Sequence, residues 1–139
     1  MIVDTSALLA FFDGAEPDHA AVATALLDAE DLLVVSPYVV AELDYLLATR
    51  RGIDAELAAL RELSGGAWEL AHLGPEDLAQ AGAVVERYRD QQIGVADASN
   101  VVLAARYRTR TIATLDHRHF RVLRAPDGGG FTLVPPSLV

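Results

Sequence analysis

The feature that most constrains this chain is an alternation of short apolar runs with longer helical stretches. The short runs are too brief for helices, and we expect strands at residues 1–4, 32–35, 67–73, 111–115 and 131–134. Between them lie stretches with helical patterning, and we expect helices at residues 5–12, 16–29, 37–51, 53–63, 75–89 and 96–107, with a helical turn at 117–120. Strands that alternate with helices predict an α/β fold, with a mainly parallel sheet of four to five strands between two helical layers.

Length and composition predict one soluble domain over residues 1–139. Apolar residues make up 52% of the chain, which argues against disorder. The complete absence of cysteine excludes disulfides, thiol nucleophiles and thiolate metal sites. We see no secretory signal and no run of about 18 uninterrupted apolar residues, so we expect a soluble protein without a membrane span. The absence of cysteine is compatible with the reducing cytoplasm, which is the location we expect.

The charge pattern is uneven. The formal net charge of −9 is unfavourable for binding nucleic acid, because phosphates repel an acidic surface. All eleven basic residues are arginines, however, and six of them crowd the last third of the chain. Arginine binds phosphate through two parallel hydrogen bonds, so this cluster could form a local basic rim.

Two acidic residues follow predicted strands. Asp4 ends the first strand and Asp116 follows the strand at 111–115. Ligands of open α/β sheets collect at the carboxyl ends of the strands, so both residues are site candidates. A single Asp in such a position more often caps the next helix, and each could do so here.

Two further acids lie on predicted helices. Glu42 shares a helix face with large apolar residues, so its carboxylate either requires a partner in the core or turns to water at the rim. Asp97 begins the helix at 96–107, where an acid ordinarily complements the helix dipole. Asn100, one turn later, could add a polar contact.

The four acids taken together favour a metal site. Two carboxylates about 4 Å apart repel each other by roughly 4 kcal/mol at an effective dielectric of 20. A divalent cation bound between them makes the electrostatic energy of the group favourable. Oxygen ligands without cysteine or a paired-histidine motif favour Mg²⁺ or Mn²⁺ over Zn²⁺.

Four segments of the chain resemble a known family in order and spacing. They are MIVDTSALL with Asp4, SPYVVAEL with Glu42, GVADASNVVLA with Asp97 and TIATLDHRHF with Asp116. The chain resembles the PIN-domain ribonucleases, in particular the VapC toxins of bacterial toxin–antitoxin pairs. The resemblance implies a Rossmann-like fold and a Mg²⁺- or Mn²⁺-dependent endoribonuclease that cleaves transfer or ribosomal RNA.

The resemblance also implies roles for individual residues. Asp4, Glu42, Asp97 and Asp116 match the catalytic acids of the family, and Asp4 and Asp97 match the positions that bind metal. Small polar positions that line such sites match Ser6 and Thr114. The implied partners are an RNA substrate, a VapB-like antitoxin and a second copy of the chain in a homodimer.

Some assignments remain open at this stage. Arg118, Arg121 and Arg124 are candidates for RNA phosphate binding, whereas His117 and His119 are more simply explained as exposed polar turn residues. Tyr38, Tyr45 and Leu46 could equally form a contact surface or part of the core. One alternative function is a non-catalytic module whose acidic pocket binds a partner. An aspartyl-phosphate phosphatase is a weaker alternative, because such sites need a lysine and this chain has none.

Overall fold

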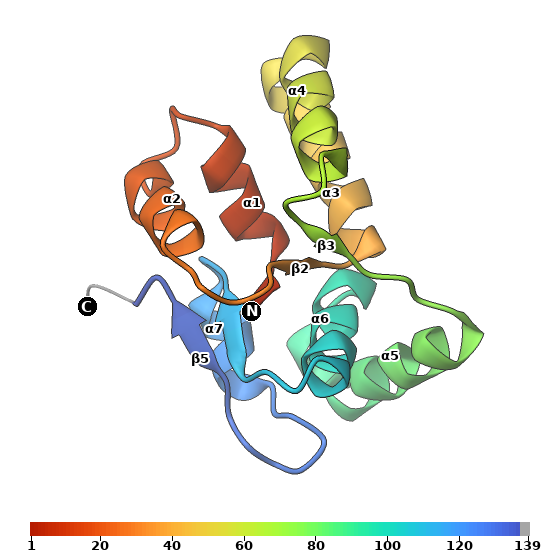
Figure 1. The fold of residues 1–139 in the computed structure, drawn as a ribbon. Coiled ribbons are helices and arrows are strands. Elements are labelled where there is room, and N and C mark those ends of the chain that lie inside the picture. Colours follow the sequence, from red (N-terminus) through yellow and green to blue (C-terminus); the bar gives the residue numbers. More distant parts are fainter. Residues whose placement is uncertain (137–139) are drawn as a thin grey trace.

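The computed structural model describes residues 1–136. Its strands are β1 (Ile2–Val3), β2 (Val34–Val35), β3 (Glu69–Leu70), β4 (Thr111–Ala113) and β5 (Thr132–Val134). Its helices are α1 (Thr5–Phe12), α2 (His19–Leu27), α3 (Pro37–Arg51), α4 (Ile53–Ser64), α5 (Pro75–Arg87), α6 (Val95–Arg106) and α7 (His117–Val122), with a 3-10 turn at Arg89–Gln91. Figure 1 shows their arrangement.

The strands form one parallel sheet in the order β3-β2-β1-β4-β5. Successive side chains of a strand point to opposite faces, and the two residues of β1 follow this rule. Ile2 packs into one hydrophobic cluster and Val3 into the other. In β4, Ile112 and Ala113 divide between the clusters in the same way. The predicted three-layer α/β fold with a parallel sheet is therefore confirmed.

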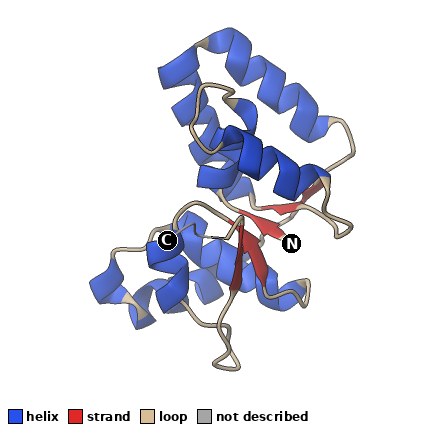
Figure 2. Ribbon diagram, turned by 90° about the vertical axis from the view of Figure 1, so that its left-hand side faces the viewer, coloured by secondary structure: helices blue, strands red, loops and turns tan. Residues whose placement is uncertain are grey.

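The helices divide between the two faces of the sheet. Side chains of α1, α2, α3 and α4 build the first cluster, and most side chains of the second come from α5, α6 and α7. In Figure 2 the strands lie between these two groups of helices. Both faces of β1 and β2 and most of β4 are therefore shielded from water, which explains why these strands read as apolar runs, whereas the edge strands β3 and β5 are partly exposed.

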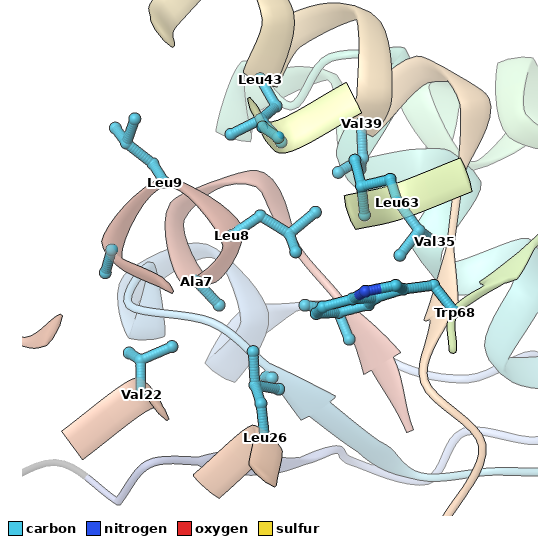
Figure 3. Close-up of a cluster of buried hydrophobic side chains, with 14 of the residues drawn as sticks. Ala7, Leu8, Leu9, Val22, Leu26, Val35, Val39, Leu43, Leu63 and Trp68 are labelled. Carbon is cyan, nitrogen blue, oxygen red and sulfur yellow. The ribbon is translucent and has the colours of Figure 1, made fainter. Parts of the chain in front are cut away.

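The first cluster is built around Trp68, at the entrance to β3. Its indole ring lies among aliphatic side chains that include Leu8 and Leu63 (Figure 3). Phe11 contacts it edge-on, with ring centroids 5.5 Å apart. Aromatic pairs of this geometry add about 0.5–1.5 kcal/mol beyond burial alone. The edge strand β3 is thus fixed to α1 and α4 although only two of its residues pair with β2.

Some helix boundaries differ from the predicted ones. The helix expected at 16–29 begins at His19, because Asp13 directs the preceding residues into turns. Its carboxylate accepts the Ala15 N–H at 3.0 Å, and its carbonyl accepts the Glu16 N–H at the same distance. Aspartate commonly forms such turns in competition with helix. Within residues 1–136, no helix is long and apolar enough to cross a membrane.

The strand order explains where the candidate acids lie. Residues after β1 pass to one face of the sheet, whereas the connection from β3 to β4 runs through α5 and α6 on the other face. Between the ends of β1 and β4, one chain connection therefore lies on one face of the sheet and the other connection on the opposite face. The crevice at such a point is the usual ligand site of open α/β sheets. Asp4 follows β1 directly, and Asp116 lies shortly after β4 at the N-cap of α7.

Candidate active site

Asp4 is a buried carboxylate held by three side-chain donors. It is 4% exposed, and its Oδ1 accepts a hydrogen bond from the Asn100 amide at 3.0 Å. Its Oδ2 accepts hydrogen bonds from the Thr114 hydroxyl at 2.9 Å and from the Ser6 hydroxyl at 3.2 Å. Burial raises the pKa of Asp4 in spite of these donors, and the negative charge of Asp116 adds to the effect.

The side chain of Asp4 does not cap α1. The helix-capping explanation, which sequence alone favoured for a single Asp in this position, is therefore wrong for Asp4. It is correct for Asp116, whose Oδ1 accepts the His119 backbone N–H at 3.2 Å and so caps α7. Asp116 keeps its second carboxylate oxygen for the site.

Asp97 lies in the first turn of α6, and its side chain is 19% exposed. Burial is the main cause that raises its pKa to about 7, and repulsion from Asp4, Asp116 and Glu42 contributes further. His119 opposes the shift. The helix dipole, which favours the charged form of an acid at a helix start, therefore has less effect on the pKa of Asp97 than burial and the neighbouring acids.

Glu42 lies on α3 at the exposed rim of the same site. Of the two alternatives that sequence left open, the structure shows the rim position. The carboxylate still repels Asp97, so it contributes to the negative potential of the site.

The four predicted acids line one cleft of about 430 Å³. The remaining lining residues come from α1, α3, the loop before α6, and α6 and α7 themselves. They are Thr5, Ser6, Leu9, Leu46, Arg50, Gln92, Gly94, Ala96 and His119. Residues from distant parts of the chain thus form a common acidic cavity.

Ser6 and Thr114 connect the ends of β1 and β4. Their hydroxyl oxygens are 3.1 Å apart, and both donate to Asp4. The Ser6 hydroxyl also accepts the Leu115 N–H, and the Thr114 hydroxyl accepts the Asp116 N–H, each at 2.9 Å. These two side chains therefore fix the loop that carries Asp116 relative to Asp4.

The three arginines predicted to bind RNA lie outside the lining of this cleft. Arg118, Arg121 and Arg124 are all exposed. The guanidinium of Arg124 donates to the Arg121 carbonyl at 2.6 Å and to the Leu123 carbonyl at 3.0 Å. Arg124 thus completes the carboxyl end of α7, which is an ordinary use of a basic residue there.

Two ionisable residues of the cleft were not predicted from the sequence to belong to the site. Arg50 lies on the same face of α3 as Glu42, eight residues or about two helical turns later, and this spacing was the available signal. His119 was expected to be exposed, but its side chain is 31% exposed and faces two of the acids. The signal was its position three residues after Asp116, one turn along α7.

The donor set fits a divalent cation. Asp97, Asp116 and His119 each offer a ligand atom, and these atoms lie within 4.8 Å of one another. Thr5 lines the cleft and is 4% exposed, yet its hydroxyl has no hydrogen-bond partner among the described residues. Buried carboxylates that repel each other are stabilised when a cation joins them.

Comparison with known proteins identifies the sequence family. A profile of the PIN domain matches residues 1–125. Ribonuclease VapC26 of Mycobacterium tuberculosis is 67% identical over 135 residues, which cover 97% of this chain and 100% of the relative.

Solved structures share the fold at low sequence identity. VapC20 of Mycobacterium tuberculosis, a sarcin–ricin loop cleaving toxin, has a TM-score of 0.78 at 19% identity, covering 84% of this chain and 89% of that one. VapBC2 of Rickettsia felis, bound to a DNA fragment from its promoter, has a TM-score of 0.68 at 16% identity, and the match covers 95% of this chain and 96% of that one. FitAcB of Neisseria gonorrhoeae has a TM-score of 0.58 at 21% identity, covering 94% and 96%.

Proposed function

Because this chain belongs to the PIN-domain family and is a VapC-type ribonuclease toxin, we propose that its acidic cleft hydrolyses RNA phosphodiester bonds with the help of a divalent cation. The observation that carries the proposal is the common cleft lined by Asp4, Glu42, Asp97 and Asp116. Two of these carboxylates have raised pKa values, which is typical of a site prepared to bind a cation or a proton.

Asp4 and Asp97 are the proposed metal ligands, and Asp116 and Glu42 complete the acidic set. A bound divalent cation would lower the pKa of a water molecule and polarise the scissile phosphate. In the reaction a water molecule gives up one proton as its oxygen bonds to phosphorus, the bond from phosphorus to a ribose oxygen breaks, and that ribose oxygen takes up a proton. Ser6, Thr114 and Asn100 contribute by orienting Asp4.

The proposed cation is Mg²⁺ or Mn²⁺. The carboxylates supply hard oxygen donors, which suit both ions. A cation would also reduce the repulsion between the acidic cleft and the phosphates of RNA, which the net charge of −9 otherwise opposes.

Arg50 is the proposed contact for an RNA phosphate next to the acids. Its side chain is 52% exposed, and its guanidinium lies 3.8 Å from the Glu16 carboxylate. An exposed ion pair of this length is weak, so a phosphate can replace Glu16 at little cost. Arg118, Arg121 and Arg124 remain predicted contacts for RNA farther from the cleft.

The remaining proposals concern partners and location. A VapC-type toxin implies a cognate VapB-like antitoxin, and we propose that this chain pairs with one, forms a homodimer and acts in the cytoplasm. We further propose that the antitoxin inhibits by covering the acidic cleft. A complex purified from cells that express both chains should be inactive on RNA, and full activity of that complex would contradict this mode of inhibition.

The decisive experiment is incubation of purified protein with total cellular RNA, followed by mapping of new 5′ ends. We expect discrete ends in Mg²⁺ or Mn²⁺, none in EDTA, and none with Asp97→Asn. RNA that is bound but left intact under all metal conditions would contradict the nuclease function and favour a non-catalytic binding module. The mapped ends would also identify the target as transfer or ribosomal RNA.

A further inference from the structure

His119 is directed at the acids by its place in α7. Asp116 precedes the helix as its N-cap, and residue 119 lies one turn later on the same side. The imidazole Nδ1 is 2.9 Å from Asp116 Oδ2 and 3.6 Å from Asp97 Oδ2. One nitrogen is therefore close to a carboxylate oxygen from each of two helices.

These contacts do not satisfy the nitrogen as a hydrogen bond would. Among the described residues, Nδ1 of His119 has no hydrogen-bond partner of acceptable geometry, although it is shielded from solvent. Hydrogen bonds need the donor N–H to point at the acceptor. A nitrogen and an oxygen that lie this close without such alignment are arranged like two ligands whose lone pairs point at one shared cation.

The spacing of the donors agrees with that interpretation. In an octahedral shell with bonds of about 2.1 Å, neighbouring ligand atoms are about 3.0 Å apart and opposite ones about 4.2 Å apart. The distances from His119 Nδ1 to the two carboxylate oxygens, 2.9 Å and 3.6 Å, are close to those between neighbouring ligands. The ligand atoms of Asp97, Asp116 and His119 all lie within 4.8 Å of one another. A small inward shift of the side chains would be enough to enclose an ion.

We propose that Asp116 and His119 add an oxygen and a nitrogen ligand to the cation proposed above at Asp4 and Asp97, and that His119 makes the site favour divalent transition-metal ions over Mg²⁺. The proposal rests on the metal-dependent function proposed above and adds a ligand of a different chemical type. Mg²⁺ strongly prefers oxygen and keeps its water ligands, whereas imidazole binds first-row transition-metal ions well. An all-carboxylate site lacks this source of discrimination.

Mn²⁺ added as manganese chloride is a suitable probe, because pulsed electron paramagnetic resonance detects nitrogen bound to it directly. We expect nitrogen coupling in the wild-type protein and in His117→Gln, which alters a histidine on the same helix. The coupling should be absent in His119→Gln. Calorimetric titration should show the preference for Mn²⁺ over Mg²⁺ falling by about tenfold in His119→Gln and remaining unchanged in His117→Gln.

The outcomes separate the two proposals. Bound Mn²⁺ without nitrogen coupling in the wild type would overturn the role of His119 and leave metal-dependent cleavage intact. Coupling that persists in His119→Gln would also overturn it, because the nitrogen would then come from elsewhere. A wild-type protein that binds Mg²⁺ but not Mn²⁺ would overturn the role of His119 alone. A wild-type protein that binds neither ion would overturn both proposals, and this result does not depend on how any variant folds.

Discussion

The side-chain amide of Asn100 donates a hydrogen bond to Asp4 Oδ1 at 3.0 Å, joining residues 96 positions apart in the chain. Asn100 lies on α6, whereas the other donors to Asp4 are Ser6 on α1 and Thr114 after β4. Three separate elements therefore fix one carboxylate whose burial disfavours its charged form. This arrangement orients Asp4 for a ligand at the expense of stability in the metal-free protein.

Asp4→Asn should abolish RNA cleavage without destabilising the metal-free fold. The amide cannot replace a carboxylate as a cation ligand, and we expect activity to fall by at least about 10²-fold, since metal charge stabilisation is worth several kcal/mol. The hydroxyls of Ser6 and Thr114 can rotate to accept hydrogen bonds from the new amide. Cleavage assays and thermal unfolding in EDTA would measure the two effects.

Asp13→Asn is the matched control for this change. Asp13 is also buried, at 7% exposed, but it ends α1 outside the cleft, and its carboxylate accepts the Ala15 N–H and lies 3.5 Å from Arg51. We expect a loss of about 0.5–2 kcal/mol in unfolding free energy with activity retained. Loss of activity in both variants would indicate general disruption and remove the special role of Asp4.

The metal-free protein should lose stability as the pH rises from about 4 to 7. The pKa of Asp97 increases from 3.8 in the unfolded chain to about 7 in the folded state, so in this window the folded state binds more protons. Stability then decreases with pH, and the raised pKa of Asp4 acts in the same direction. We expect a melting temperature in EDTA several degrees higher at pH 5 than at pH 8, and a flatter profile in Asp97→Asn. A wild-type melting temperature that rises between these pH values would contradict this account of the acids.

Much of the fold could be predicted because its signals are local. The β-branched run at Val34–Val35 and the Ser36-Pro37 start of α3 are each specified by neighbouring residues, and Ser36 does accept the Tyr38 N–H at 3.1 Å. The late start of α2 was missed because Asp13, which forms the preceding turns, lies outside the stretch whose periodicity was read. Helix patterning alone does not reveal such competition.

The site was predicted less completely because it depends on contacts between distant segments. Asp4 and Asp116 occupy similar positions after strands, yet only Asp116 caps its helix by a side-chain bond. The difference comes from Asn100 and Thr114, which draw the Asp4 carboxylate inward. His119 was misjudged for the same reason, since its environment includes Asp97, 22 residues earlier in the sequence.

Divalent cations should stabilise the wild-type protein against heat. A ligand present at 100 times its dissociation constant adds about 2.7 kcal/mol, which corresponds to roughly 10 °C for a domain of this size. We expect Mn²⁺ to raise the melting temperature of the wild type, and Asp97→Asn to remove most of the shift. An unchanged wild-type melting temperature at millimolar Mn²⁺ would argue against a preformed metal site.

Arg50→Gln should weaken RNA binding through the loss of one phosphate contact. The guanidinium lies in the cleft lining with Glu42 and Asp97, whereas neighbouring Arg51 pairs with Asp13 away from it, so Arg51→Gln is the matched control. Binding is best measured in an Asp4→Asn background, where the RNA stays intact. One lost contact to single-stranded RNA should reduce the slope of log affinity against log salt concentration by about 0.7. Both substitutions remove one positive charge, so a general effect of net charge would change the two slopes equally. Only a direct phosphate contact at Arg50 would reduce the slope of the Arg50 variant more, and equal slopes would therefore contradict the assignment.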